Sequence, residues 1–194
     1  VSVLPIADDG TLGDATIYTH GPGAHQGLEG RWGDGPQFRQ ESAHPHGVVV
    51  CGQQLYVADL GTNQVIGWSI DYDAGTLLPA GAVTVHDLAG PRHVQFTRDG
   101  TLGFSLNELD NTVTVLRRET QAGAVSVVQT LSSIPTGWAE AHTDPATFPN
   151  EVYSQPSHAS ELLLSPDDRF VYASNRGHDS IAVFAIDASN HRLT

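Results

Sequence analysis

Four side chains that could bind an anion and move a proton stand at short polar interruptions between apolar runs. They are His46 in "HPHGV", Arg92 in "GPRHV", Glu108 in "NELDNT" and Arg176 in "SNRGHDS". An arginine fork clamps carboxylate or phosphate groups, and a carboxylate or an imidazole can act as a general acid or base. The turn at 174–180 does not need an arginine, so Arg176 is a candidate for a functional role.

Each of these residues also has a structural interpretation. Glu108 could be a solvated turn carboxylate, Arg92 could pair with an acidic neighbour, and a lone histidine such as His46 is more often structural. His44 and His46 could suggest a metal pair, but no third ligand stands at a matching spacing. We therefore expect no metal and no other cofactor. His93 follows Arg92, so its side chain is expected to point the other way, into packing between sheets.

The elements that must position these residues form an internal repeat. Three segments share one apolar pattern, read as strand, turn, strand, polar turn and strand, and they begin at His46, Arg92 and Ser160. A fourth strand follows in the first two segments, and no amphipathic helix pattern competes. Repeats of roughly 40 to 50 residues with four antiparallel strands are typical of propeller blades. The sequence thus predicts an all-β fold, an incomplete β-propeller ring of about three and a half blades.

The units of this ring follow from the repeat. We expect two closing strands of a blade at 1–20, blades at 46–86 and 92–132, three strands of a blade at 159–194, and long loops at 20–45 and 132–158. Too few blades are present to close a ring, so the missing blades are expected from further sequence or from a partner chain. The chain contains no methionine, and we interpret it as an internal piece of a longer protein.

Antiparallel strands place the start of each first strand and the turn between the second and third strands at one rim. The repeat therefore gathers two sets of three equivalent residues around one mouth of the channel. The first strands begin with His46, Arg92 and Ser160, and the turns contain Leu60, Glu108 and Arg176. Long loops without periodicity are usually lids or binding loops. We expect the loops at 20–45 and 132–158 to lie over this rim, and the second of them carries Trp138, Phe148 and Tyr153. His158 and Glu161 lie near the third of these strands and are expected to contribute to substrate binding.

Composition limits the partners. The chain has 194 residues and a net charge of −13, and its nine cationic side chains are all arginines. An acidic chain is a poor match for nucleic acid, and no run approaches the roughly 20 apolar residues of a membrane span. The single cysteine, Cys51, allows no internal disulfide and favours a reducing compartment, so a cytoplasmic location is expected.

At these residues the sequence resembles the seven-bladed propeller lactonases, which include 6-phosphogluconolactonases and 3-carboxy-cis,cis-muconate lactonizing enzymes. The matching stretches are "HPHGV…LYVADLGTNQV", "GPRHVQF…NELDNTVTV" and "SPDDRFVYASNRGHDSIAVFAID". The resemblance implies a catalytic cluster of His46, Arg92, Glu108 and Arg176. These are the four residues with an ionisable or charged side chain among the six that the repeat gathers.

The resemblance implies hydrolysis, or formation, of a small anionic lactone of the sugar-acid or muconate type, and we favour an activity like that of 6-phosphogluconolactonase. The expected ligand is this lactone or its open acid. Arg92 and Arg176 would hold its carboxylate or phosphate, while Glu108 and His46 handle the proton in an order that the sequence leaves open. The alternatives are a muconate-type cyclase, a calcium-dependent six-bladed lactonase and a non-catalytic binding scaffold. With about half a ring absent, this piece alone is expected to be inactive.

Overall fold

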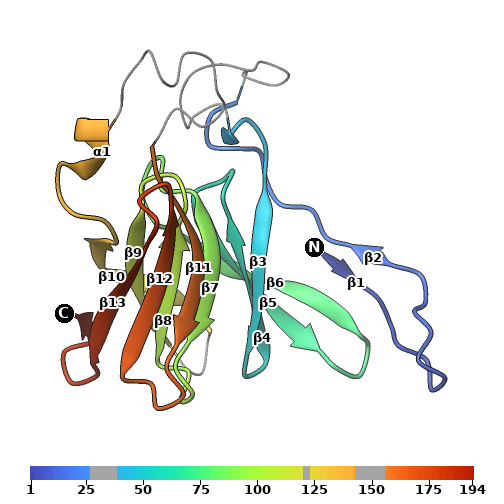
Figure 1. Ribbon diagram of the computed structural model, residues 1–194. Coiled ribbons are helices and arrows are strands. Elements are labelled where there is room, and N and C mark those ends of the chain that lie inside the picture. The colour runs from blue at the N-terminus through green and yellow to red at the C-terminus, as the bar shows by residue number, and fades with distance from the viewer. Residues whose placement is uncertain (27–38, 120–122, 143–155) are drawn as a thin grey trace.

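The computed structural model describes residues 1–26, 39–119, 123–142 and 156–194 (Figure 1). Within them the chain forms three four-stranded antiparallel sheets and a two-stranded hairpin. The hairpin consists of β1 (Ser2–Val3) and β2 (Thr16–Ile17). The three sheets confirm the predicted all-β repeat.

The sheets are built from consecutive strands. The first contains β3 (Pro45–Cys51), β4 (Gln54–Asp59), β5 (Gln64–Asp71) and β6 (Thr76–Thr84). The second contains β7 (Pro91–Phe96), β8 (Leu102–Asn107), β9 (Thr112–Arg118) and β10 (Val125–Ser132). The third contains β11 (His158–Leu164), β12 (Phe170–Arg176), β13 (Ser180–Asp187) and β14 (Arg192–Leu193).

The first strands of the three sheets, β3, β7 and β11, lie side by side (Figure 1). The second strands β4 and β8 are buried along their whole length, because sheets or the hairpin cover both of their faces. This arrangement fixes the ends of the second strands relative to the first strands of the neighbouring sheets. It is these ends that carry the candidate site.

Apolar clusters between the sheets hold the stack together. Between the first and second sheets the buried core includes Tyr56, Val65, Val94 and Leu116. Between the second and third sheets it includes Leu102, Phe104, Leu106, Leu162 and Val171. A single sheet cannot bury its apolar faces alone and does so only against the neighbouring sheets. Burial of these side chains is therefore the main contribution to the stability of the fold, about 1.5–3 kcal/mol for each large side chain.

Polar contacts between sheets repeat at equivalent places. Asp59 and Asn175 stand at corresponding positions near the ends of β4 and β12, and a residue that follows the last strand of the preceding unit reaches each of them. His20 Nδ1 lies 2.5 Å from Asp59 Oδ2, and Ser133 Oγ donates to Asn175 Oδ1 at 2.6 Å. These contacts join successive sheets at the rim of the candidate site.

Two elements differ from the sequence expectation. The last unit, expected as three strands, has a fourth, because β14 pairs Leu193 with Ile186 and Arg192 with Asp187. The loop expected at 132–158 contains a five-residue helix, α1 (Trp138–His142). Both are too short to produce a periodic signal. No helix in the described parts of the chain has the length and apolar character that a membrane crossing requires.

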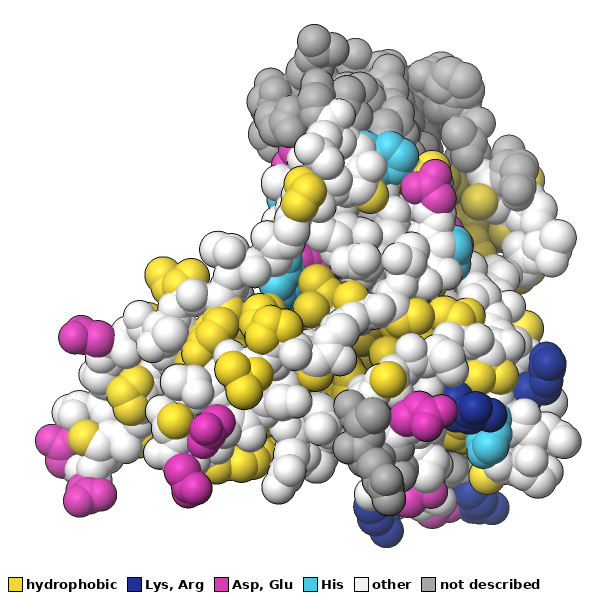
Figure 2. All heavy atoms as spheres, turned by 180° about the vertical axis from the view of Figure 1, so that it is seen from behind, with side chains coloured by type: hydrophobic (Ala, Val, Ile, Leu, Met, Phe, Trp, Pro, Cys, Tyr) yellow, Lys and Arg dark blue, Asp and Glu magenta, His cyan; other side chains and the backbone are white. Residues whose placement is uncertain are grey.

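Both ends of the stack present apolar side chains. On the third sheet Tyr172, Ile181 and Val183 are between 36% and 67% exposed. At the other end, Val48 and Val50 of β3 are more than half exposed. Figure 2, seen from behind, shows hydrophobic side chains gathered in a band across the middle of that face. Exposed apolar patches of this extent are rare on the surface of monomeric globular proteins.

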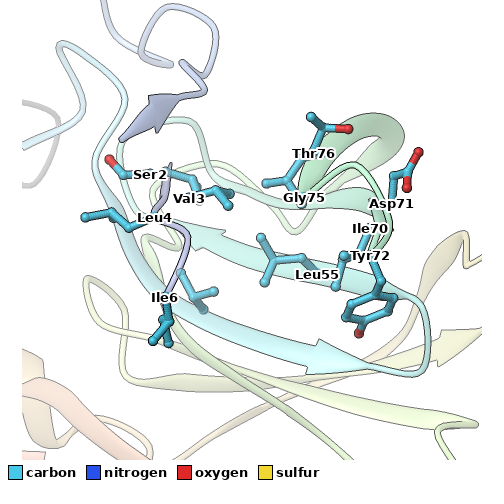
Figure 3. Close-up of a pocket in the computed structure, with 13 residues that line it drawn as sticks. Ser2, Val3, Leu4, Ile6, Leu55, Ile70, Asp71, Tyr72, Gly75 and Thr76 are labelled. Carbon is cyan, nitrogen blue, oxygen red and sulfur yellow. The ribbon is translucent and has the colours of Figure 1, made fainter. Parts of the chain in front are cut away.

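The hairpin covers part of the first sheet and leaves a groove. The groove has a volume of about 660 Å³ and lies between the β1 segment and strands β4 to β6. In Figure 3, Val3, Leu4 and Ile6 stand on one side, and Leu55, Ile70 and Tyr72 stand on the other. Its lining is mainly apolar, so it belongs to the open end of the stack and offers little for catalysis.

Candidate functional site

A β-bulge near the start of each first strand re-aims the side chains at the rim. The register of β3 shifts between Pro45 and Gly47, which leaves His46 as the extra residue. The register of β7 shifts between Pro91 and His93, which leaves Arg92 extra. In β11 the shift falls between Ala159 and Leu162 and includes Glu161. A bulged residue stands outside the ladder, so its side chain need not follow the alternation of the strand.

Glu108 lies at the centre of the candidate site, where three arginines from separate parts of the chain bind its carboxylate. Its side chain is only 3% exposed. Oε1 accepts hydrogen bonds from Arg39 Nη1 at 2.8 Å and from Arg176 Nη2 at 2.9 Å. Oε2 accepts a hydrogen bond from Arg92 Nε at 3.0 Å. We call these four residues the arginine–glutamate cluster. Three guanidinium groups and one carboxylate give it two positive charges in excess.

The backbone fixes Glu108 in this place. It directly follows β8, and its N–H donates to Gly90 O at 2.8 Å, while Leu109 N donates to Ala89 O at 3.1 Å. These two bonds tie the turn after β8 to the segment that enters β7. The carboxylate and the Arg92 guanidinium are therefore carried by one locally rigid unit.

The other two arginines reach the carboxylate from neighbouring units. Arg176 is the last residue of β12, and Gly177, with φ of +97°, turns the chain immediately after it. Arg39 precedes Gln40, whose side chain is fully buried and donates from Nε2 to Leu60 O at 2.6 Å. Exposure of the arginine side chains ranges from 16% for Arg92 to 50% for Arg176. The cluster is therefore buried at Glu108 and open on the side of Arg176.

The charges of the cluster keep Glu108 ionised. Burial by itself would raise the pKa of this carboxyl group, but the hydrogen bond from Arg39 and the charges of the three arginines outweigh it. The pKa of Glu108 therefore lies below its ordinary value of 4.5. A carboxylate in this state is a weak base and, near neutral pH, has no proton to give.

His46 has the opposite character. Burial is the main reason why the pKa of His46 lies below its ordinary value of 6.5; the positive charge of Arg92 lowers it further, and Glu108 opposes this effect. The imidazole is thus mostly neutral at pH 7 and has a lone pair with which to accept a proton. Its ring centroid lies 5.3 Å from that of His93.

The expectation that His93 points away from Arg92, into packing, is wrong. Arg92 Nη1 lies 2.9 Å from His93 Nε2, and Nδ1 of the same ring lies 2.8 Å from Glu161 Oε1. The bulge at Arg92 explains the error, because two consecutive residues at a bulge can face the same side of a sheet. Glu161, expected to contribute to substrate binding, contacts the site through His93.

The structure also places the remaining candidates. His158, at the start of β11, is the cross-strand partner of Arg176, and both of its ring nitrogens are buried. Leu60 and Ser160 stand at the rim, and the backbone carbonyl of Ser160 accepts a hydrogen bond from Arg92 Nη1. The Trp138 ring in α1 packs edge-on against His178, 4.6 Å between centroids. Phe148 and Tyr153 lie outside the described residues.

Arg39 is the participant that the sequence reasoning missed. It lies in the loop at 20–45, which has no periodicity and no repeat partner, so alignment of the units could not assign it a position. A usable signal was present, because the chain has only nine cationic residues and an anion site needs several.

In the described parts of the chain, no group of three or more His, Cys, Asp or Glu side chains is arranged to hold a metal ion. His44 contacts Glu41, with Nε2 and Oε1 3.0 Å apart. The arrangement at the rim is suited to an anion beside a neutral imidazole. The arginines can bind a carboxylate or phosphate group and can stabilise an oxyanion, and His46 can accept a proton.

Comparison with known proteins gives consistent results. The family model described as "Lactonase, 7-bladed beta-propeller" matches residues 1–194. The 6-phosphogluconolactonase of Bacillus subtilis is 31% identical over 100% of this chain and 48% of its own length. The periplasmic gluconolactonase of Pseudomonas aeruginosa has a TM-score of 0.77 at 28% identity, covering 99% of this chain and 48% of that one.

A crystal structure of a protein from Lactobacillus plantarum has a TM-score of 0.76 at 31% identity, covering 100% of this chain and 49% of that one. The chain thus spans about half the length of the curated relatives and solved structures that it matches. The sheets described above are blades, and the predicted fold, a partial β-propeller, is confirmed. The sequence match over the whole chain, together with the blade architecture, establishes that this chain belongs to the seven-bladed β-propeller lactonase family.

Proposed function

We propose that the complete protein hydrolyses a small anionic lactone of the 6-phosphogluconolactone type, and that this chain supplies the substrate-binding rim. The single observation that carries the proposal is the arginine–glutamate cluster, in which Arg39, Arg92 and Arg176 converge on the buried Glu108. A scaffold that binds no anion gives no reason for this convergence, and turnover of a lactone separates catalysis from anion binding alone. The name of the Bacillus subtilis relative, 6-phosphogluconolactonase, supports the substrate class.

The substrate anion binds where positive charge is in excess. The cluster carries two more positive than negative charges within a chain of net charge −13. Guanidinium groups bind phosphate and carboxylate oxygens in bidentate fashion. Arg176, half exposed, is the arginine best placed to exchange its bond with Glu108 for one with the incoming anion. Glu108 stays ionised and holds the guanidinium groups in position.

Proton transfer belongs to His46 in this proposal. The neutral imidazole takes a proton from water, and the hydroxide oxygen forms a bond to the lactone carbonyl carbon. The resulting oxyanion is stabilised by the guanidinium of Arg92. The bond between the carbonyl carbon and the ring oxygen then breaks, and the imidazolium returns its proton to that oxygen. The products are a hydroxyl group and the open acid, which ionises at neutral pH.

The proposal includes the rest of the ring, which further sequence or a partner chain supplies. Two observations support it: the relatives are about twice as long as this chain, and both ends of the stack present apolar faces. A blade packs on both sides in a closed ring, so additional blades would cover these faces. We expect the 194-residue chain alone to be inactive.

The test is a panel of lactones assayed on the complete propeller, with proton release measured in weakly buffered solution. The panel contains 6-phosphoglucono-δ-lactone, glucono-δ-lactone and a muconolactone, and the muconate acid is included to detect ring closure. The proposal predicts fastest hydrolysis of the phosphorylated lactone. Ring closure of the muconate acid as the faster reaction would replace hydrolysis with the cyclase assignment.

A further inference from the structure

We propose that His93 is a positioning residue that orients the Arg92 guanidinium, and that Glu161 acts on Arg92 through His93. The inference rests on the proposed function, which assigns to Arg92 the stabilisation of the oxyanion that forms in the reaction. The residues form a continuous chain of contacts from Glu161 on β11 through His93 and Arg92 on β7 to Glu108 after β8.

The direction of each bond follows from the donors and acceptors. A guanidinium group has only N–H donors, so the contact of 2.9 Å between Arg92 Nη1 and His93 Nε2 requires a lone pair on Nε2. The ring proton must then sit on Nδ1, which faces Glu161 Oε1 at 2.8 Å. Glu161 therefore selects the tautomer of His93 that can accept from Arg92. A carboxylate that accepts a hydrogen bond from one ring nitrogen of a histidine commonly sets the tautomer and the orientation of the ring in this way.

The contacts of Arg92 with the described residues involve only two of its three nitrogen atoms. In the described part of the chain, Nε donates to Glu108, and Nη1 is shared between His93 and the backbone carbonyl of Ser160. Nη2 is the remaining donor. Because the guanidinium is planar, fixing Nε and Nη1 also fixes the direction in which Nη2 points. His93 thus aims the donor that remains for the anion.

The backbone explains why these groups meet. The bulge in β7 lies at Arg92 and the bulge in β11 includes Glu161, and β7 and β11 are neighbouring first strands. Without the bulge, strand alternation would turn His93 to the face opposite Arg92. Pro91 stands directly before the bulged residue, where its missing N–H costs the ladder no bond.

Two substitutions of His93 in the complete propeller separate positioning from packing. His93→Leu removes the acceptor, and we expect kcat/KM to fall about 10- to 100-fold, the scale of a misplacement of about 1 Å in a binding group. His93→Gln retains a carbonyl oxygen for Arg92 and an N–H for Glu161, so we expect it to recover most of the lost activity. Glu161→Ala, at a half-exposed side chain, should lower kcat/KM in the same direction by less.

The matched control is Gln95→Leu. Gln95 lies two residues after His93 on the same strand and accepts a hydrogen bond of 3.3 Å from Leu164 N of β11. Its replacement breaks a contact between the same two strands without touching Arg92. Near-normal kcat/KM in this variant supports a specific effect of His93. An equal loss in Gln95→Leu and His93→Leu would assign the effect to loosening of the β7–β11 contact and overturn the inference.

The decisive comparison uses an Arg92→Ala background. If His93 acts only through Arg92, His93→Leu causes no further loss there, and Glu161→Ala causes none in a His93→Leu background. A full loss from His93→Leu without Arg92 would refute the positioning role. A second readout does not depend on lactonase activity: the side-chain Nε–Hε NMR signal of Arg92. We expect His93→Leu to shift it and His93→Gln to restore it, even if no lactone is hydrolysed. An unchanged signal in His93→Leu would also refute the role.

Discussion

Replacing Glu108 with glutamine tests the electrostatic centre of the site, because it preserves size and removes only the charge and one acceptor. The carboxylate oxygens accept three guanidinium bonds, two at Oε1 and one at Oε2. The amide of glutamine has one oxygen and one NH₂ group. Whichever way it is oriented, its NH₂ group faces at least one arginine N–H, so at least one bond becomes a contact between two donors.

The size of the effect follows from burial. Glu108 is 3% exposed and Arg92 is 16% exposed, so solvent screens their interaction little, whereas Arg176 is half exposed and contributes less. Hydrogen bonds to charged groups contribute about 1.5–3 kcal/mol each. We therefore expect Glu108→Gln to lower the free energy of unfolding by roughly 2–4 kcal/mol. Loss of one such hydrogen bond in the transition state, about 1.5–3 kcal/mol, should lower kcat/KM by about 10- to 150-fold.

The assay is urea unfolding of the complete propeller, followed by tryptophan fluorescence, alongside lactone hydrolysis. The control is Glu119→Gln, the same chemical change at an exposed pair in which Arg117 lies 3.8 Å away. We expect the control to shift the free energy of unfolding by no more than about 0.5 kcal/mol. If Glu108→Gln is no more destabilising than this control and leaves kcat/KM unchanged, the cluster neither stabilises the rim nor serves catalysis.

Three further outcomes follow from individual contacts. Because burial lowers the pKa of His46, the acidic limb of a kcat/KM profile should fall at a pH below 6.5, and His46→Gln should remove this limb. Gly177→Ala should lower the free energy of unfolding by roughly 1–3 kcal/mol and weaken anion binding at Arg176, because φ is +97° and a Cβ would collide with a neighbouring carbonyl oxygen. The hydrogen bond with Asp110 raises the pKa of His86 above 6.5, so its stabilising effect is full below that pH and is lost as pH rises through the raised value. Urea unfolding as a function of pH should therefore show a slope above about pH 6.5 that Asp110→Asn abolishes.

The repeat in the sequence predicted the architecture and brought together the three residues that the structure joins most directly. Glu108 and Arg176 follow or end the second strands of successive units, β8 and β12, and Arg92 stands at the start of β7, the first strand of the unit that holds Glu108. A repeat of antiparallel strands brings these two kinds of position to one rim. The roles of these three residues in catalysis remain predictions until activity is measured. His46 lies beside them, and its lowered pKa separates its role from that of Glu108, which the residue types alone could not do.

The residues that sequence reasoning misplaced or missed depend on local backbone geometry. Regular strand alternation predicts that His93 and Arg92 face opposite sides of the sheet, and the bulge at Arg92 breaks this alternation. Pro45 and Pro91 stand at the same place in two repeats, directly before the bulged residues, and are the sequence signal for these bulges. Arg39 lies in a loop without periodicity, so only three-dimensional structure connects it to Glu108. Short elements such as β14 leave no pattern to detect.

The central claim is that the guanidinium groups at this rim bind the anion of a lactone that the protein hydrolyses. Its most direct test is the rate of 6-phosphoglucono-δ-lactone hydrolysis by the complete propeller and by its Arg92→Ala variant at one ionic strength. We predict clear turnover by the unmodified protein and a loss of at least about 100-fold in the variant. Equal rates in the two proteins, or no hydrolysis above the uncatalysed rate in either, would contradict the claim.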